Sequence, residues 1–168
     1  MFTIRPLTNA DAARIVDLIL PIQQQEFNVA INLAAQPDLL DIEAFYFRDG
    51  GHFWGAIDTD NGQLVGTVAL LSIGQGAGAL RKMFVRSAFR GKEFAIAQRL
   101  LDALIDYCVS HSISTLYLGT IDSMKAAHRF YERNGFTRIE KTALPAYYPN
   151  MAVDNMYYYR TINTFALS

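Results

Sequence analysis

The fold of this chain is decided by the stretch Val85-Arg86-Ser87-Ala88-Phe89-Arg90-Gly91-Lys92-Glu93-Phe94-Ala95-Ile96-Ala97-Gln98-Arg99-Leu100-Leu101, which runs from a strand through a basic turn into a helix. The first backbone N–H groups of a helix have no partner within the helix and carry partial positive charge, so they bind anions. Arg90 and Lys92 add two cations, and Gly91 lets an anion approach the main chain because it has no Cβ. The stretch therefore predicts an anion-binding turn at the start of a helix.

A second stretch, Ala-Ala-His-Arg-Phe-Tyr-Glu-Arg-Asn-Gly-Phe at residues 126–136, indicates a helix with an aromatic pair near its end. Gly135 closes this helix, and Phe136 begins a strand. Together the two stretches resemble the GNAT superfamily of N-acetyltransferases. The first signature of that family is Arg/Gln-x-x-Gly-x-Gly/Ala after a strand, and the second is a helix that ends in Tyr-x-x-x-Gly-Phe. The resemblance extends over roughly residues 64–140.

The resemblance implies an acetyl-CoA-dependent enzyme that transfers the acetyl group directly, in a ternary complex, to a primary amine of a small molecule or peptide. In this family two parallel strands splay apart, so that free main-chain groups of the first strand pair with pantetheine; the matching strands here are 79–85 and 115–119. The residues implied to bind the cofactor are Met83, Phe84, Val85, Arg90, Gly91, Lys92, Ala95, Ile96, Ala97 and Gln98. No metal is expected.

The chain departs from the family pattern at several positions. Ala95-Ile96-Ala97 aligns with the last Gly-x-Gly, which leaves Glu93 and Phe94 as a two-residue extension of the turn. Alanine at 95 and 97 is compatible with helical backbone angles but brings a methyl group toward the ligand. Met124 replaces an asparagine that is common in the family. These departures keep open a second hypothesis, a catalytically idle coenzyme A-binding module used for sensing or assembly.

The resemblance also suggests the catalytic groups. Tyr131 matches the tyrosine that donates a proton to the departing coenzyme A sulfur, and His128, one turn earlier on the same face, is the alternative donor. A base must deprotonate the amine, and the acidic candidates on the expected acceptor side are Glu26 and Glu43. We take Tyr131 and Glu26 as the predicted catalytic pair. A solvated helix face is the competing interpretation of Glu26.

Composition limits the class of protein. The 168 residues suit one domain over residues 1–168, and 51% hydrophobic with 18% charged residues indicates a globular chain. A net charge of −1 argues against nucleic-acid binding, and no apolar run is long enough to span a bilayer, so we expect no membrane partner and a cytoplasmic location. The lone Cys108 fits core packing. Basic residues between Arg81 and Lys92 are interpreted as charge for a phosphorylated cofactor.

The order of predicted elements indicates an α/β chain with one mixed, largely antiparallel twisted sheet and helices on both faces. The resemblance to the GNAT superfamily adds a central splayed parallel strand pair. Helices are expected over 11–25, 39–47, 95–111 and 125–133, and strands over 2–5, 53–58, 64–72, 79–85, 115–119, 136–141 and 156–161. The proline-rich aromatic segment 144–151 is expected as a loop over the acceptor side or as packing. With the tyrosines at 157–159 it could form an aromatic wall that holds a cationic amine by cation–π contact or seals a homodimer interface.

Overall fold

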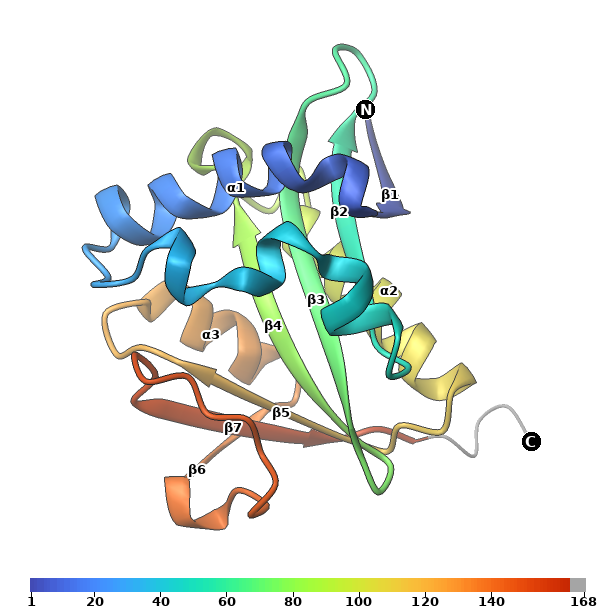
Figure 1. Ribbon diagram of the computed structural model, residues 1–168, viewed down its shortest axis with the longest axis vertical. Helices are drawn as coiled ribbons and strands as arrows, with labels where there is room; N and C mark the ends of the chain where they lie inside the picture. Colours follow the sequence, from blue (N-terminus) through green and yellow to red (C-terminus); the bar gives the residue numbers. More distant parts are fainter. Residues whose placement is uncertain (164–168) are drawn as a thin grey trace.

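Strands that are buried on both faces need apolar side chains on both sides, and two long strands of this chain meet that condition. β3 (Leu64–Gly74) and β4 (Ala77–Val85) are mostly buried and lie at the centre of the sheet. The computed structural model describes residues 1–163, in which seven strands form one sheet in the order β1-β2-β3-β4-β5-β7-β6 (Figure 1). The remaining strands are β1 (Phe2–Pro6), β2 (His52–Asp58), β5 (Thr115–Thr120), β6 (Thr137–Ile139) and β7 (Met156–Thr161).

The sheet opens between β4 and β5, its parallel pair. Residues 77–79 of β4 pair with residues 115–117 of β5, and the pairing stops there. Beyond that point β4 continues to Val85 paired with β3 alone, while β5 continues to Thr120 paired with β7. All other neighbouring strands are antiparallel. The splayed parallel pair and the mixed sheet are therefore confirmed.

Helices cover both faces of the sheet (Figure 1). α1 (Ala12–Pro21) and the helical turns that follow it pack over one face, where Ile15, Ile19 and Phe53 belong to one buried cluster. α2 (Ile96–Ser110) and α3 (Lys125–Arg133) pack on the other face, around a larger cluster that includes Leu100 and Leu116. Cys108 lies in this second cluster, fully buried, as the sequence predicts.

The N-terminal helical layer differs from the prediction in two places. The expected helix over 11–25 is α-helical only to Pro21 and continues as a π-helical turn over Ile22–Glu26. The expected helix over 39–47 is interrupted: a 3₁₀ turn over Pro37–Leu40 and a π-helical turn over Glu43–Phe47 are separated at Asp41. The carboxylate of Asp41 accepts hydrogen bonds from the Asn9 side chain and the Ala44 N–H, and these contacts hold the break in place.

Other bounds shift by a few residues, and the segment near residue 140 changes more. The expected strand 136–141 is shortened to β6, and a 3₁₀ turn over Lys141–Ala143 follows it. The bounds of α3 and β7 are as predicted. Within residues 1–163 no helix combines the length and the apolar character that crossing a membrane requires.

Candidate active site

The opening between β4 and β5 leads into a cleft of about 690 Å³. Its walls come from the end of β4, the turn before α2, the first turn of α2 and the face of α3. The ten residues predicted to bind the cofactor all line this cleft: Met83, Phe84, Val85, Arg90, Gly91, Lys92, Ala95, Ile96, Ala97 and Gln98. The structure therefore brings the two separate sequence motifs to one cavity.

The first turn of α2 faces this cleft without a side-chain cap. Ala95 occupies the N-cap position in the left-handed conformation, with φ of 53°, which corrects the expectation of helical angles there. No side chain among the described residues accepts a hydrogen bond as a cap of this helix. The N–H groups at the start of α2 are thus available to an anion, and Gly91, with φ of 138°, supplies a backbone conformation that other residues rarely adopt.

Two carboxylates lie beside the basic turn. The guanidinium of Arg90 donates to both carboxylate oxygens of Glu26, with 2.8 Å from Nη2 to Oε1, and these hydrogen bonds hold the pKa of Glu26 below its ordinary value. Glu93 folds back over Gly91, where a Cβ would lie 2.7 Å from its Oε2. Lys92 is exposed. The structure therefore joins the predicted base Glu26 to the predicted cofactor ligand Arg90. Arg90 lines the large cleft, whereas Glu26 lines neither cavity.

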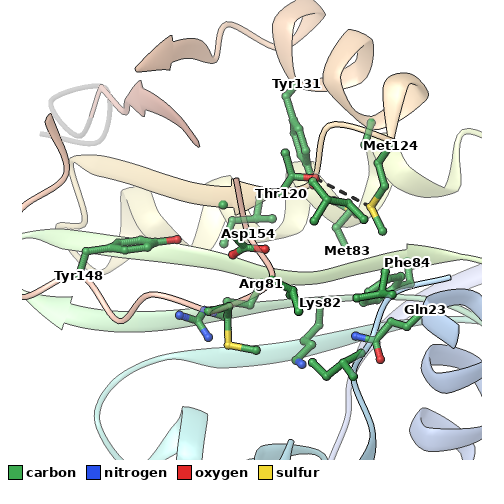
Figure 2. A pocket seen from close by; sticks show the side chains of 18 residues that line it. Gln23, Arg81, Lys82, Met83, Phe84, Thr120, Met124, Tyr131, Tyr148 and Asp154 are labelled. Atoms are coloured by element: carbon green, nitrogen blue, oxygen red, sulfur yellow. Dashed lines mark hydrogen bonds between the residues drawn. The ribbon is translucent and has the colours of Figure 1, made fainter. Parts of the chain in front are cut away.

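A second, smaller cavity of about 120 Å³ continues from the cleft toward β5 and β7 (Figure 2). The two cavities share Met83, Phe84, Met124, Ala127 and Tyr131 in their walls. The small cavity is closed by the segment before β7, which contributes Tyr148, Met151 and Asp154. A molecule that extends along β4 from α2 would therefore meet the contents of the small cavity at Tyr131.

Tyr131 stands at this junction, on α3. It is 5% exposed, its ring packs against Phe130, Phe136 and Tyr158, and burial raises its pKa far above that of a free phenol. The hydroxyl therefore stays protonated at neutral pH and well above it, and it can donate a proton or a hydrogen bond. Among residues 1–163 it has no hydrogen-bond partner of its own.

His128 and Glu43, the other two catalytic candidates, are held by contacts elsewhere. The Nε2 atom of His128 lies 2.8 Å from the carbonyl oxygen of Ile121, and the ring lines neither cavity. The carboxylate of Glu43 accepts a hydrogen bond from the Asn9 N–H at 2.9 Å, on the exposed side of the helical layer. Both contacts are structural.

The small cavity is polar on two sides. Asp154 lies against β5, where a Cβ on Gly119 would overlap its carboxylate, and burial raises its pKa to about 6 despite the neighbouring cations Arg81 and Lys82. Arg81 donates to the carbonyl oxygen of Pro149. Figure 2 shows Arg81, Asp154 and the Tyr148 side chain around the same space. The charged groups of the small cavity therefore come from β4 and from Asp154, beside the aromatic loop predicted over 144–151.

Lys82 sits in a bulge of β4. Its φ is 55°, and the pairing with β3 shifts between Thr67 and Ala69, so two residues of β4 oppose one of β3. The Thr67 hydroxyl donates to the Lys82 carbonyl oxygen at 2.7 Å. The ammonium group reaches the helical layer, where it donates to Gln36 and lies 3.7 Å from Asp38. Burial lowers the pKa of Lys82.

The basic cluster needs one correction, and one residue was missed. Arg81 and Lys82 line the small cavity and not the cofactor cleft, so they do not serve as charge for a phosphorylated cofactor. Sequence reasoning missed Asp154 altogether. The sequence offered one signal for it. Asp154 is the one acidic side chain between residues 141 and 168, in a stretch rich in tyrosine and methionine.

Known proteins share the fold and parts of the sequence. The model of the acetyltransferase (GNAT) family matches residues 16–136. A curated relative, N-acetylaspartate synthetase from Danio rerio, is 39% identical over 114 residues, which are 67% of this chain and 39% of that protein. This chain therefore spans about two fifths of the length of that relative.

Two solved structures illustrate the range of similarity. An acetyltransferase of the GNAT family from Staphylococcus aureus Mu50 superposes with a TM-score of 0.93 at 38% identity, over 97% of this chain and all of that one. N-acetylglutamate synthase from Neisseria gonorrhoeae, solved with coenzyme A and N-acetylglutamate, has a TM-score of 0.70 at 18% identity over 97% of this chain and 35% of that one, and it shows the shared fold. With the splayed strands, the open helix start and the family match over most of its length, the chain belongs to the acetyltransferase (GNAT) family.

Proposed function

We propose that this protein is an acetyl-CoA-dependent N-acetyltransferase whose acceptor is a primary amine carried by a small molecule with a carboxylate. The observation that carries the proposal is the pair of connected cavities that meet at Tyr131. The large cleft has the size and the main-chain donors for coenzyme A, and the small cavity has room for a small acceptor only. The name of the Danio rerio relative, N-acetylaspartate synthetase, supports an amino-acid acceptor.

The residues of the cleft fit the cofactor in two ways. The edge of β4 that faces the splay, from Met83 to Val85, has no strand partner in β5, so its main chain can pair with the pantetheine amides. The uncapped first turn of α2, from Ile96 to Gln98, can receive the pyrophosphate. Arg90 and Lys92 add positive charge, of which Glu26 offsets a part. Acetyl-CoA, when bound, supplies an activated thioester.

Tyr131 is proposed as the acid of the reaction. Its hydroxyl borders both cavities, so it can reach the position where a thioester sulfur and an amine meet. Because burial keeps the phenol protonated, Tyr131 can give its proton to the sulfur as the C–S bond breaks. Its placement is what makes it useful, since a phenol is a weak acid.

The assignment of Glu26 as the base remains a prediction, and two observations argue against it. Its carboxylate is bound to Arg90, and its lowered pKa makes it a poorer proton acceptor than an unpaired carboxylate. In this position Glu26 is suited to orienting Arg90. The competing interpretation of Glu26, a solvated helix face, therefore fits the structure better than a role as base in the acceptor cavity.

The test is steady-state release of free thiol from acetyl-CoA with a panel of amines: L-aspartate, L-glutamate, phenethylamine and a peptide with a free N-terminus. The proposal expects release that depends on the amine and is fastest with an amino acid that carries a side-chain carboxylate. The competing hypothesis, an idle coenzyme A-binding module, expects calorimetric binding of acetyl-CoA without amine-dependent release. That second pattern with every amine would reject the proposed function.

A further inference from the structure

The wall of the small cavity includes the carboxylate of Asp154, for which none of the contacts described so far gives a structural role. Among the described residues that line this cavity, Asp154 is the one acidic side chain. It precedes β7 in a segment whose other wall residues are apolar or aromatic, such as Met151 and Val153. A buried carboxylate without a structural partner costs stability, and such groups concentrate at functional sites.

The backbone around Asp154 is fixed while its carboxylate is left free. The Asp154 N–H donates to the Met151 carbonyl oxygen at 3.1 Å, and the Tyr157 hydroxyl donates to the Asp154 carbonyl oxygen at 3.1 Å. Within residues 1–163 no hydrogen bond or salt bridge holds the carboxylate. Arg81 and Lys82 of β4 interact with it only through longer-range electrostatics. The main-chain hydrogen bonds thus hold Asp154 in the wall of the small cavity, with its carboxylate free to act as a base.

Gly119 makes the room for this carboxylate. A Cβ at position 119 would overlap Asp154 Oδ2, so the carboxylate lies directly on the backbone of β5 at the open end of the splay. Tyr131, on the other side, is close enough for the two groups to influence each other, since the charge on Asp154 contributes to the raised pKa of Tyr131. The proposed acid and this carboxylate therefore border one space (Figure 2).

We propose that Asp154 is the catalytic base, which takes a proton from the acceptor's ammonium group inside the small cavity, while Arg81 holds the acceptor's carboxylate. This proposal rests on the proposed function and names the residues of its acceptor subsite. Arg81 faces the same cavity from β4, donates one hydrogen bond to the carbonyl oxygen of Pro149 and also hydrogen-bonds the side chain of Tyr148. Its guanidinium has five N–H donors, so the remaining ones can meet an anion. An amine and a carboxylate on one small molecule match the two charges.

The proton balance is complete with these groups. One N–H bond of the ammonium breaks, and its proton moves to Asp154, which later releases it to solvent. The amine nitrogen then forms the C–N bond as the C–S bond breaks, and the sulfur takes the hydroxyl proton of Tyr131. The second proton lost by nitrogen returns to the Tyr131 oxygen. One free thiol, one amide and one released proton result.

The charges that face Asp154 set the pH range in which it works. Arg81 and Lys82 approach from β4, Tyr131 from α3, Tyr148 from the preceding loop and Tyr157 from β7. Burial outweighs the two cations and raises the pKa of Asp154 to about 6. At neutral pH the carboxylate is mostly ionised and is still a better proton acceptor than an ordinary aspartate. Glu26 has the opposite shift.

The experiment compares the pH dependence of kcat/KM for the full chain and for Asp154→Asn, with acetyl-CoA and L-aspartate as substrates. The parent is expected to rise with an apparent pKa near 6, and the variant to lose that step and about 10²-fold in kcat/KM at pH 7. The deficit should shrink at alkaline pH, where the free amine becomes abundant. Asp122→Asn is the matched control, because Asp122 is exposed and lines neither cavity.

A second variant guards against a general loss of folding. Gly119→Ala keeps the carboxylate but displaces it, so it should lower kcat/KM in the same direction with unchanged calorimetric affinity for acetyl-CoA. An Asp154→Asn variant that is active with the parent's pH profile would overturn the assignment while leaving the proposed function intact. If the parent itself released no thiol with any amine, the proposed function would fail and the base assignment with it.

Discussion

Tyr131 belongs to the core and also lies where the two cavities meet, the place of its proposed chemistry. Its ring is part of the cluster around α2 and α3, while its hydroxyl borders both cavities. The sequence predicted this residue because the Tyr-x-x-x-Gly-Phe pattern is local. Asp154 could not be predicted in the same way, because its raised pKa comes from burial in the tertiary structure, where its carboxylate lies against Gly119 of β5, far away in the chain.

Tyr131→Phe separates these two roles. The change keeps the ring and its packing and removes the hydroxyl, so we expect kcat to fall by about 10²-fold with nearly unchanged thermal stability. Steady-state thiol release and thermal unfolding measure the two effects. Tyr117→Phe is the control, since Tyr117 lies on β5 outside both cavities, and it should leave kcat unchanged. Equal turnover in the Tyr131→Phe variant would remove the acid role.

Asp154→Asn also carries a prediction for stability. Its carboxyl titrates near pH 6 in the folded chain because burial raises its pKa, against an ordinary value of 3.8. The folded parent therefore loses stability as pH rises from about 4 to about 6, and above that range the variant should be more stable by about 1–3 kcal/mol. Urea unfolding at pH 7.5 and pH 3.5 measures the difference, which should vanish at the lower pH. A destabilised variant at pH 7.5 would show that the carboxylate is structural.

At the scale of elements, the sequence predicted what depends on local periodicity. α3 and β7 have the expected bounds, and the cleft collects the ten predicted cofactor residues, because a strand, a turn and a helix in succession define their own geometry. The helix over 39–47 is interrupted because Asp41 bonds Asn9, which is far away in the chain, and no local pattern reveals that contact. The left-handed conformation of Ala95 was missed for a related reason, because it depends on how the turn that Glu93 and Phe94 lengthen connects to the start of α2.

The left-handed conformation of Ala95 predicts a stabilising change. Replacement by glycine removes the Cβ penalty at φ of 53°, so Ala95→Gly should raise the free energy of unfolding by about 0.5–1 kcal/mol. Ala97→Gly is the matched control in the helix itself, where glycine is expected to cost about 0.5–1 kcal/mol. Urea denaturation compares the two variants. Destabilisation by both would mean that Ala95 is not strained.

The basic turn before α2 predicts a change in cofactor affinity. Arg90→Ala combined with Lys92→Ala should weaken acetyl-CoA binding by about 1–3 kcal/mol, because two cations that line the cleft are removed. Calorimetry measures the loss. Arg99→Ala is the control, since Arg99 is an exposed cation of α2 that bonds the Phe2 carbonyl oxygen and lies outside the cleft. An unchanged affinity in the double variant would move the pyrophosphate away from this turn.

At the scale of the whole molecule, the N-terminal helical layer is joined to the sheet by a buried polar network. Lys82, in the bulge of β4, bonds Gln36 and lies 3.7 Å from Asp38, which in turn accepts a hydrogen bond from the Tyr46 hydroxyl. Gln36 also exchanges hydrogen bonds with Gln23. The same bulge helps to shape the small cavity, so the contact between the two layers and the proposed acceptor subsite both depend on Lys82.

This dependence can be measured with a double-mutant cycle. Lys82→Met leaves the carboxylate of Asp38, 17% exposed, without its cation, and should lower the free energy of unfolding by about 3–5 kcal/mol. Asp38→Asn added to that variant keeps an acceptor for Tyr46 and removes the unpaired charge, so it should recover most of the loss. Additive losses in the cycle would contradict the pairing. Recovery would show that the charge pair, and not the polar atoms alone, fixes the helical layer against the sheet and thereby holds the wall of the small cavity at Lys82 in place.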